Sequence, residues 1–378
     1  MKIGVDVRGL LNNQITGVGE YTFNLLKALL AAEASKHYVL FSSSFAKALL
    51  PEEFLHNHRI EHRHLKCPNK LFNVSLKFFE LPRLDKLIGP VDVFWFPNLN
   101  FWSVSSACPT VVTVHDLSFE KLPWAYSIKR RLWHHAIKPG KKLNQATVLA
   151  AVSQNTKHDL IKTYGLPSSK IEVVYPALPD FYPGQSATVD KELVLPDKYL
   201  LFLGTLEPRK NIESVIRAFS GLAWSDYFLI IAGGQGWLYQ KIYQLVKELN
   251  LENKVRFLGY VSPEQKHNLL KQARLLIWPS FYEGFGLPPL EAMAAGVPVI
   301  SSADSSLPEV LGRAALLVDP YNIQEIKEAI NQAINNSDLR QNLINQGYEQ
   351  VNKFSWQESA DKMLKIFEKI NSNARSVK

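Results

Sequence analysis

The feature of this 378-residue sequence that most limits its fold is a series of short, almost continuously apolar runs separated by segments with helical periodicity. Six runs lie in the first half, at residues 2–7, 37–42, 91–96, 110–116, 147–153 and 171–176. Six more lie in the second half, at residues 199–204, 227–234, 254–259, 274–280, 298–301 and 314–319. Apolar runs without alternation are typical of parallel strands covered on both faces. The helical segments between them predict right-handed crossovers and therefore open α/β sheets.

The alternation of strands and helices pauses between residues 175 and 196. Four prolines, a glycine and many polar residues make this stretch typical of an interdomain linker. We therefore predict two doubly wound, Rossmann-like domains with these boundaries: residues 1–180, a linker at 181–197, and residues 198–354. The chain continues into an amphipathic helix at residues 355–372, in which Ser355 can serve as the N-cap and Glu358 follows three residues later.

Composition excludes several classes of protein. With 46% hydrophobic and 21% charged residues, the chain has ordinary globular composition. Cys67 and Cys108 are its two cysteines, too few for a disulfide framework or a thiolate metal cluster, which fits a reducing cytoplasm. The N-terminus does not resemble a signal peptide, and no apolar stretch reaches the ~18 residues that a membrane span needs. We expect a cytoplasmic protein, soluble or peripheral on the inner face of the membrane.

The net charge of +8 lies in the N-terminal half. Residues 1–185 hold 22 Lys and Arg against 14 Asp and Glu, whereas the remainder carries 21 of each. The excess indicates either an anionic partner or surface lysines that are merely solvated. No aromatic-basic motif accompanies it, so we expect no nucleic acid among the partners.

The most basic segment, residues 125–142, leaves two interpretations open. Its helical periodicity puts Ile128, Leu132 and Ala136 on one face, with cations around the others. Together with residues 71–87, LFNVSLKFFELPRLDKL, a segment that is expected to expose aromatic side chains, it could lie on an anionic membrane. Alternatively, Leu132 and Trp133 pack into the N-terminal core and the cations only face solvent.

Two glycine-containing turns are candidates for phosphate binding. Residues 16–20 place Gly17, Val18 and Gly19 between a strand and a helix, where backbone can approach an anion. No third glycine completes the dinucleotide fingerprint, so a plain loop is the alternative. In the second half, a buried strand ends at Gly204, and a second motif follows it.

That second motif is an Arg-Lys pair before a helix. Arg209 and Lys210 directly precede a segment with Asn211 at its cap position. Two adjacent cations at a helix N-terminus can neutralise a diphosphate, whereas an isolated pair is usually a solvated turn.

The segment 279–301, PSFYEGFGLPPLEAMAAGVPVIS, is the most informative. Glu283 lies in a glycine-rich loop, and Glu291 is expected near the first turn of a helix begun by two prolines. The two carboxylates can accept hydrogen bonds from two separate sets of hydroxyls. Backbone amides of Phe285, Gly286 and Leu287 can face an anion between them. The pattern fits a sugar nucleotide, although both acids could be ordinary.

This spacing of glutamates resembles the motif of retaining glycosyltransferases with the GT-B fold, two Rossmann-like domains facing a central cleft. The segments FLGTLEPRKNIESVIRAF, IAGGQGW, SSLPEVLGRAALLVDP and, in the first half, VTVHDLSF make the chain similar to glycosyltransferase family 4. The likeness covers nearly the whole chain, except that residues 43–90 match poorly. It implies that the last helix returns to the N-terminal domain and that residues 198–354 bind the donor.

The resemblance also implies roles for single residues. Arg209 and Lys210 would bind the donor diphosphate, Glu291 the ribose and Glu283 the hydroxyls of the transferred sugar. His115 would sit beside the reacting sugar, catalytic together with Glu283, with Asp116 as a possible supporting residue. The remaining expected donor-binding residues are Gly17, Val18, Gly19, Gly204, Phe285, Gly286 and Leu287.

The expected activity is transfer of a hexose from a nucleotide diphosphate to an acceptor hydroxyl, with retention of configuration. No Asp-x-Asp pair or metal-spaced His/Cys cluster occurs in the sequence. Arg209 and Lys210 would replace the divalent ion, so we expect neither a metal nor a cofactor. Mannose from GDP-mannose is the favoured donor sugar, and UDP-glucose or another UDP-sugar is the alternative.

The acceptor is expected to be a saccharide or a lipid-linked saccharide, in polysaccharide or glycolipid synthesis. A nucleotide-sugar epimerase of the same fold and a non-catalytic polyanion-binding protein are the remaining alternatives. The first lacks this family's combined motifs, and the second leaves the donor motifs unexplained.

Overall fold

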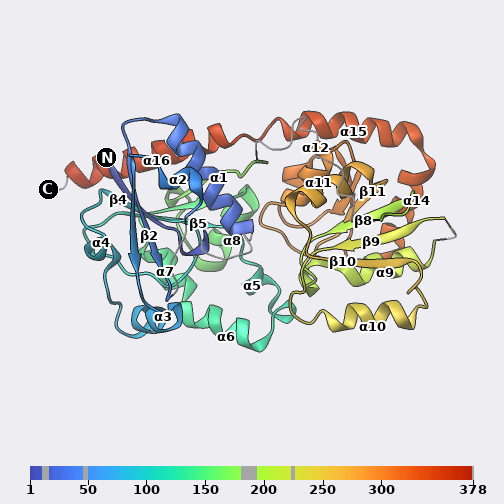
Figure 1. Ribbon diagram of the computed structural model, residues 1–378, viewed down its shortest axis with the longest axis horizontal. Helices are drawn as coiled ribbons and strands as arrows, with labels where there is room; N and C mark the ends of the chain where they lie inside the picture. Colours follow the sequence, from blue (N-terminus) through green and yellow to red (C-terminus); the bar gives the residue numbers. More distant parts are fainter. Residues whose placement is uncertain (11–16, 46–49, 180–193, 223–225, 377–378) are drawn as a thin grey trace. The chain divides into compact units, whose positions relative to one another are not determined.

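The computed structural model (Figure 1) describes residues 1–10, 17–45, 50–179, 194–222 and 226–376. They form two compact units. Unit 1 comprises Met1–Leu117, Leu132–Pro176 and Ser355–Lys378, and unit 2 comprises Ser118–Arg131 and Ala177–Phe354. Residues 181–193 of the predicted linker lie outside the described part of the chain.

Unit 1 is built on a parallel sheet of seven strands in the order β3-β2-β1-β4-β5-β6-β7. The strands are β1 Lys2–Asp6, β2 His37–Ser43, β3 Ile60–Leu65, β4 Val93–Phe96, β5 Thr110–Val114, β6 Val148–Ala151 and β7 Ile171–Val173. The helices of this part are α1 Gly17–Ala32, α2 Glu52–Leu55, α3 Asn69–Phe78, α4 Leu84–Leu87, α7 Pro139–Gln145, α8 Gln154–Tyr164 and α16 Trp356–Ser376. The central strands are fully buried, as their apolar sequences predict.

Unit 2 contains a six-stranded parallel sheet in the order β10-β9-β8-β11-β12-β13. The strands are β8 Tyr199–Leu203, β9 Phe228–Ala232, β10 Val255–Gly259, β11 Leu275–Trp278, β12 Val299–Ser302 and β13 Ala315–Val318. Its helices are α5 Ser118–Lys121, α9 Ile212–Ser220, α10 Gln240–Glu248, α11 Pro263–Gln272, α12 Leu287–Ala294, α13 Leu307–Leu311, α14 Ile323–Asn335 and α15 Ser337–Val351. A strand lies in each of the twelve predicted runs, with β2 and β12 extending one residue further, and the predicted α/β class is confirmed.

Local sequence signals place several helix ends. The Ser262 hydroxyl accepts from the backbone N–H of Gln265 at 3.2 Å, while the Gln265 side chain accepts from the N–H of Ser262, so α11 begins with a full capping box. The Ser355 hydroxyl accepts from the N–H of Glu358 at 3.2 Å, in the capping role predicted for it. Helix α16 then packs against α1 and β4 of unit 1, with Phe367 fully buried.

The segment Ser118–Arg131 is the main difference from the predicted boundaries, which placed it in the N-terminal domain. It clusters with unit 2 because its apolar residues pack there. Leu122 and Ala125 form a small buried core with Tyr282, and Tyr126 stacks on Trp237 with ring centroids 5.4 Å apart. The Trp237 indole N–H also donates to the carbonyl of Ala125 at 2.5 Å.

The basic helix α6 (Ile128–Ile137) bears on one of the two interpretations of residues 125–142. The alternative in which both Leu132 and Trp133 pack into the N-terminal core is wrong for Leu132, which is 64% exposed. The Trp133 ring is 40% exposed and meets the buried ring of Phe101 in unit 1 edge-on, with centroids 6.2 Å apart. Ile137, at the end of α6, is the residue of this helix that is buried.

Candidate functional site

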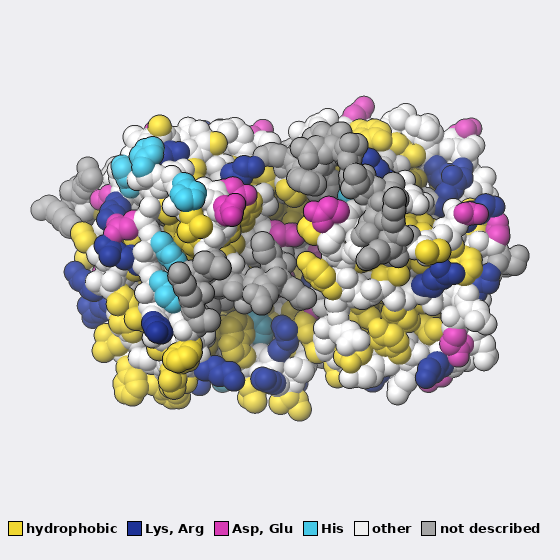
Figure 2. Space-filling model, in the orientation of Figure 1, with side chains coloured by type: hydrophobic (Ala, Val, Ile, Leu, Met, Phe, Trp, Pro, Cys, Tyr) yellow, Lys and Arg dark blue, Asp and Glu magenta, His cyan; other side chains and the backbone are white. Residues whose placement is uncertain are grey.

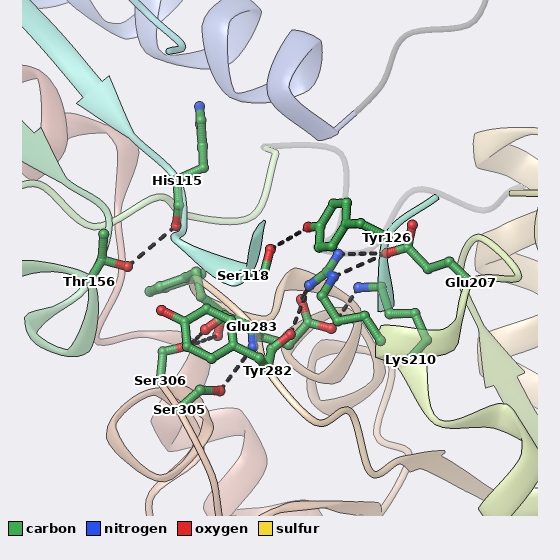
Figure 3. Close-up of polar contacts among 12 residues, drawn as sticks. His115, Ser118, Tyr126, Thr156, Glu207, Lys210, Tyr282, Glu283, Ser305 and Ser306 are labelled. Atoms are coloured by element: carbon green, nitrogen blue, oxygen red, sulfur yellow. Dashed lines mark hydrogen bonds and ion pairs between the residues drawn. The ribbon is translucent and has the colours of Figure 1, made fainter. Parts of the chain in front are cut away.

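Unit 2 gathers four ionised side chains where β8 and β11 end. The Glu283 carboxylate accepts from Arg209 Nη1 at 2.8 Å and from Lys210 Nζ at 2.6 Å. Glu207 accepts from the same guanidinium at 2.8 Å, through Arg209 Nη2 (Figure 3). Both carboxylates are buried, while the two cations keep about an eighth of their side-chain surface exposed. We call these four residues the charge cluster; its formal charge is zero.

The sequence around β8 explains where the two cations lie. Gly204 directly follows β8, and the position favours glycine because a Cβ there would come within 2.7 Å of the Trp278 ring. Lys210 lies over the same ring, with its Nζ 4.6 Å from the ring centroid. Asn211 precedes α9 as predicted, but its side chain does not cap the helix. It instead donates to the carbonyls of Pro279 and Pro320, which ties the Arg-Lys turn to the segments that follow β11 and β13.

The loop that carries Glu283 is held through its backbone. The N–H of Glu283 donates to the Ser305 hydroxyl at 2.9 Å, and the Ser306 hydroxyl donates to the carbonyls of Glu283 and Phe285 (Figure 3). Gly286 adopts φ +103, a conformation that favours glycine, directly before α12. These contacts fix the carboxylate of Glu283 against the two cations.

The amides expected to face an anion lie just before α12 and at its start. Leu287 is its first residue, but Pro288 and Pro289 follow, and proline has no N–H. Of the three expected amides, that of Gly286 belongs to the N-cap and that of Leu287 to the first residue of the helix. Phe285 precedes the N-cap, and its ring packs edge-on against that of Phe354 at 5.1 Å.

Glu291 is the fifth residue of α12, just past the first turn, close to where it was expected. Its side chain is nearly fully buried and accepts from Lys266 Nζ of α11 at 2.7 Å. Because the two predicted glutamates each pair with a cation, neither is an unpartnered carboxylate in the ligand-free protein.

The electrostatics of the charge cluster follow from burial and pairing. Burial by itself raises the pKa of Glu283, but Arg209 and Lys210 outweigh that effect and lower it to about 2. Burial and the neighbouring guanidinium lower the pKa of Lys210 from its usual range, and Glu283 opposes both effects. At neutral pH Glu283 is therefore an anion held by two cations.

In unit 1, His115 follows β5 and is oriented by three contacts. Its Nε2 lies 2.8 Å from the carbonyl of Pro97, its ring meets Tyr21 edge-on at 4.8 Å, and its own carbonyl accepts from Thr156. The ring points away from Thr156 (Figure 3). Burial lowers the pKa of His115, against opposing effects of Pro97 and Asp116. Since a carbonyl only accepts, the neutral ring carries its proton on Nε2 and leaves Nδ1 as an acceptor.

The glycine turn near the N-terminus differs from its prediction. Gly17, Val18 and Gly19 form the first residues of α1, where a separate turn was expected, and Thr16 lies outside the described residues. Among the described residues, no atom lies within 4 Å of the position that a Cβ on Gly17 would take.

Several residues of the site were missed by sequence reasoning. Glu207 is two residues from Arg209, so its spacing could have suggested the ion pair. Lys266 and Tyr21 carry no such signal, because their partners Glu291 and His115 lie on other elements of their units.

The described residues contain neither a helix that could span a membrane nor a cluster of metal ligands. No helix among them is long and apolar enough to cross a membrane. Within the same residues, no three His, Cys, Asp or Glu side chains gather into a group that could hold a metal ion.

Comparison with known proteins extends this description over the whole chain. The family model "Glycosyltransferase Family 4" matches residues 15–179, and "Glycosyl transferases group 1" matches residues 187–350. O-antigen chain mannosyltransferase B of Escherichia coli is 30% identical over 93% of this chain and 96% of its own. O-antigen chain mannosyltransferase RfbU of Salmonella typhimurium is 31% identical over 70% of this chain and 77% of its own.

Solved structures share the fold. Sucrose-phosphate synthase from Thermosynechococcus elongatus has a TM-score of 0.75 at 21% identity, covering 98% of this chain and 99% of its own. Anabaena HepE, in complex with UDP and glucose, has a TM-score of 0.71 at 18% identity, covering 98% of this chain and all of its own. These likenesses confirm the expected GT-B fold.

Proposed function

Since this chain belongs to glycosyltransferase family 4 and is a glycosyltransferase, we propose that it transfers mannose from GDP-mannose to an acceptor hydroxyl with retention of configuration and without a metal ion. The observation that carries the proposal is the charge cluster. Arg209 and Lys210 are adjacent in the chain, are largely enclosed and both contact Glu283. The planar guanidinium of Arg209 can bind two oxygens at once, whereas the ammonium of Lys210 is a compact single charge.

The donor diphosphate would exchange places with Glu283 on these cations. A diphosphate brings more negative charge than one carboxylate, and its oxygens can take both the guanidinium and the ammonium. Glu283 would then be released to accept hydrogen bonds from hydroxyls of the transferred sugar. As the sugar–phosphate bond breaks, the same two cations would stabilise the negative charge that grows on the leaving diphosphate.

Retention would follow if the acceptor approached on the face from which the diphosphate leaves. In that sequence the leaving phosphate oxygen receives the proton of the acceptor hydroxyl, so no protein base has to carry it. His115 is suited to a different task, because its neutral ring presents Nδ1 as an acceptor. We assign it a hydrogen bond from the donor sugar, with Asp116 as a supporting neighbour.

The remaining expected contacts are of two kinds. Glu291 would take the ribose hydroxyls, with Lys266 holding the carboxylate in place. Backbone groups would approach the donor at these positions: Gly17, Val18, Gly19, Gly204, Phe285, Gly286 and Leu287.

The identity of the sugar rests on the relatives. The two mannosyltransferases named above favour mannose, whereas HepE with UDP and glucose shares the fold at low identity. A UDP-sugar donor is therefore the second candidate. The proposed acceptor is a saccharide, free or lipid-linked, and the proposed location is the cytoplasm with peripheral contact to an anionic membrane.

Donor turnover without an acceptor tests the proposal directly. Purified protein is incubated with GDP-mannose or UDP-glucose, each with and without EDTA, and free nucleotide is measured against a sample carrying His115→Ala. Release from GDP-mannose that EDTA does not reduce is expected. If nucleotide is released from UDP-glucose alone, the donor assignment changes to a UDP-sugar. If EDTA abolishes the release of nucleotide, metal independence is refuted. If neither sugar nucleotide releases nucleotide, the proposed donors are refuted. An acceptor product with inverted anomeric configuration, read by NMR, would refute retention.

A further inference from the structure

Helix α3 has two apolar faces, and one of them is exposed. Phe72 and Leu76 point into unit 1 and are almost fully buried, with the Phe72 ring 5.6 Å from that of Phe41. On the other side, Leu71, Val74 and Phe78 recur at spacings of three and four residues, which puts them on one helical face. They are 64%, 49% and 65% exposed, respectively.

The exposed apolar surface continues beyond the end of the helix. Phe79 and Leu81 are 71% and 53% exposed and follow directly in the chain. We call these five residues the α3 surface: Leu71, Val74, Phe78, Phe79 and Leu81. Figure 2 shows hydrophobic side chains gathered over α3, at the lower left, with Lys and Arg side chains beside them.

Hydrogen bonds hold this segment in place. The Ser75 hydroxyl donates to the carbonyl of Leu81 at 2.7 Å, and the Ser103 hydroxyl donates to that of Glu80 at 2.6 Å. Arg8 donates to the side-chain oxygen of Asn73 at 3.2 Å. The exposure of the α3 surface is therefore that of an anchored helix and turn, which makes a contiguous apolar patch a candidate for binding.

The charge around the α3 surface is positive. Five cations between residues 66 and 87 are exposed: Lys66, Lys70, Lys77, Arg83 and Lys86. The two acids in this stretch are already engaged. Asp85 is buried and accepts from the N–H of Ser105, while Glu80 accepts from Lys141 at 3.1 Å. The apolar residues are thus bordered by cations whose charge is not cancelled within the segment.

We propose that the α3 surface docks the protein on an anionic lipid bilayer. Leu71, Val74 and Phe78 would enter the boundary between headgroups and acyl chains, and the bordering lysines and arginine would lie at the level of the lipid phosphates. Each cation near such a surface contributes about fivefold to binding, and this contribution fades within a Debye length. A second copy of the chain is a poorer occupant, because it would bring the same cations against these.

The docking surface rests on the proposed function in one respect, in that it brings the enzyme to a lipid-linked acceptor. Its test needs neither donor nor acceptor. Full-length protein is sedimented with vesicles of phosphatidylcholine, with and without phosphatidylglycerol, at low salt and at about 0.5 M salt. Binding is expected with phosphatidylglycerol at low salt and is expected to fall at high salt.

Matched variants identify the surface that binds. The test variant carries Leu71→Ser, Val74→Ser and Phe78→Ser. The control variant carries three serines at exposed apolar positions elsewhere: Leu55→Ser, Val194→Ser and Tyr260→Ser. The test variant should lose binding about tenfold or more while its circular dichroism and donor hydrolysis stay unchanged, and the control should bind as the unaltered chain does.

Three outcomes would overturn the proposal. In the first, the unaltered chain does not bind vesicles. In the second, the test variant binds vesicles as well as the unaltered chain does. In the third, light scattering shows a dimer that the three serine substitutions abolish, and the chain does not bind vesicles. Since donor hydrolysis is measured separately, failure of the docking surface is distinguishable from failure of the proposed transferase activity.

Discussion

Replacing Glu283 with Gln removes the anion at the centre of the charge cluster and keeps its size. In the ligand-free protein, Arg209 and Lys210 then remain largely enclosed, and Glu207 is the one carboxylate of the charge cluster left to balance their two charges. We therefore expect two opposite effects of one change. The fold should become less stable, and a nucleoside diphosphate should bind more tightly.

The magnitude follows from the pKa of Glu283, which falls from 4.5 to about 2 on folding. A difference of that size corresponds to about 3 kcal/mol of stability at neutral pH. Because the folded-state pKa is the lower one, this contribution is fully present above pH 4.5 and is lost as the pH falls towards 2. Glu283→Gln should therefore lower the unfolding midpoint of this unit by about 6–12 °C at pH 7 and by much less near pH 3.

The effect on ligand binding has the opposite sign because the diphosphate no longer competes with a carboxylate. One charge-assisted contact is worth about 1.5–3 kcal/mol, so affinity for GDP or UDP should rise about tenfold or more. Transfer should fall, since the sugar hydroxyls lose their acceptor.

Thermal unfolding with and without GDP or UDP, together with calorimetric titration, measures both effects. Glu252→Gln, an exposed glutamate in the same unit, is the control and should change neither quantity. An unchanged unfolding midpoint, or a tenfold weaker affinity for the nucleotide, would refute the view that Glu283 and the diphosphate compete for the same two cations.

Three further substitutions test other parts of the site. Lys210→Met should weaken donor binding and transfer together by about tenfold or more, because a charge-assisted contact is lost; unchanged steady-state kinetics would move the diphosphate elsewhere. His115→Ala should keep donor affinity, measured by titration, and lower kcat about a hundredfold; turnover near that of the unaltered chain would make His115 a structural residue. Lys266→Met should destabilise the fold by about 1–3 kcal/mol in denaturant unfolding, since it leaves the buried carboxylate of Glu291 unpaired. Adding Glu291→Gln should restore part of that loss, and strictly additive costs would mean that the two residues do not interact.

The apolar strands of both units were predictable because burial on two faces selects continuous apolar runs. Strand β3 was not predicted, because its sequence IEHRHL is apolar only at its two ends and has charged and imidazole side chains between them. It lies at the edge of its sheet, where one neighbour is enough. His62 and His64 both contact the hydroxyl of Ser42 on β2, and this cross-strand contact leaves no mark in local periodicity.

The members of the charge cluster could be nominated from sequence, but their pairing could not. Arg209 and Lys210 follow β8, and Glu283 follows β11. These strands are separated by two others in the sequence and are neighbours in the sheet. The order of strands is set by the packing of the whole sheet. Local sequence patterns therefore indicate which side chains follow each strand, but they do not indicate which strands are neighbours.

The segment Ser118–Arg131 has a consequence for how enzymes of this design can exchange parts. Unit 2 is encoded in two separate pieces of the gene, because this segment is interrupted from Ala177–Phe354 by a stretch that belongs to unit 1. A chimera joined once at the linker would inherit Trp237 and Tyr282 from one parent and the residues that pack on them from the other. A recombinant that keeps this contact intact must move both pieces together, so swapping donor domains requires four crossover points.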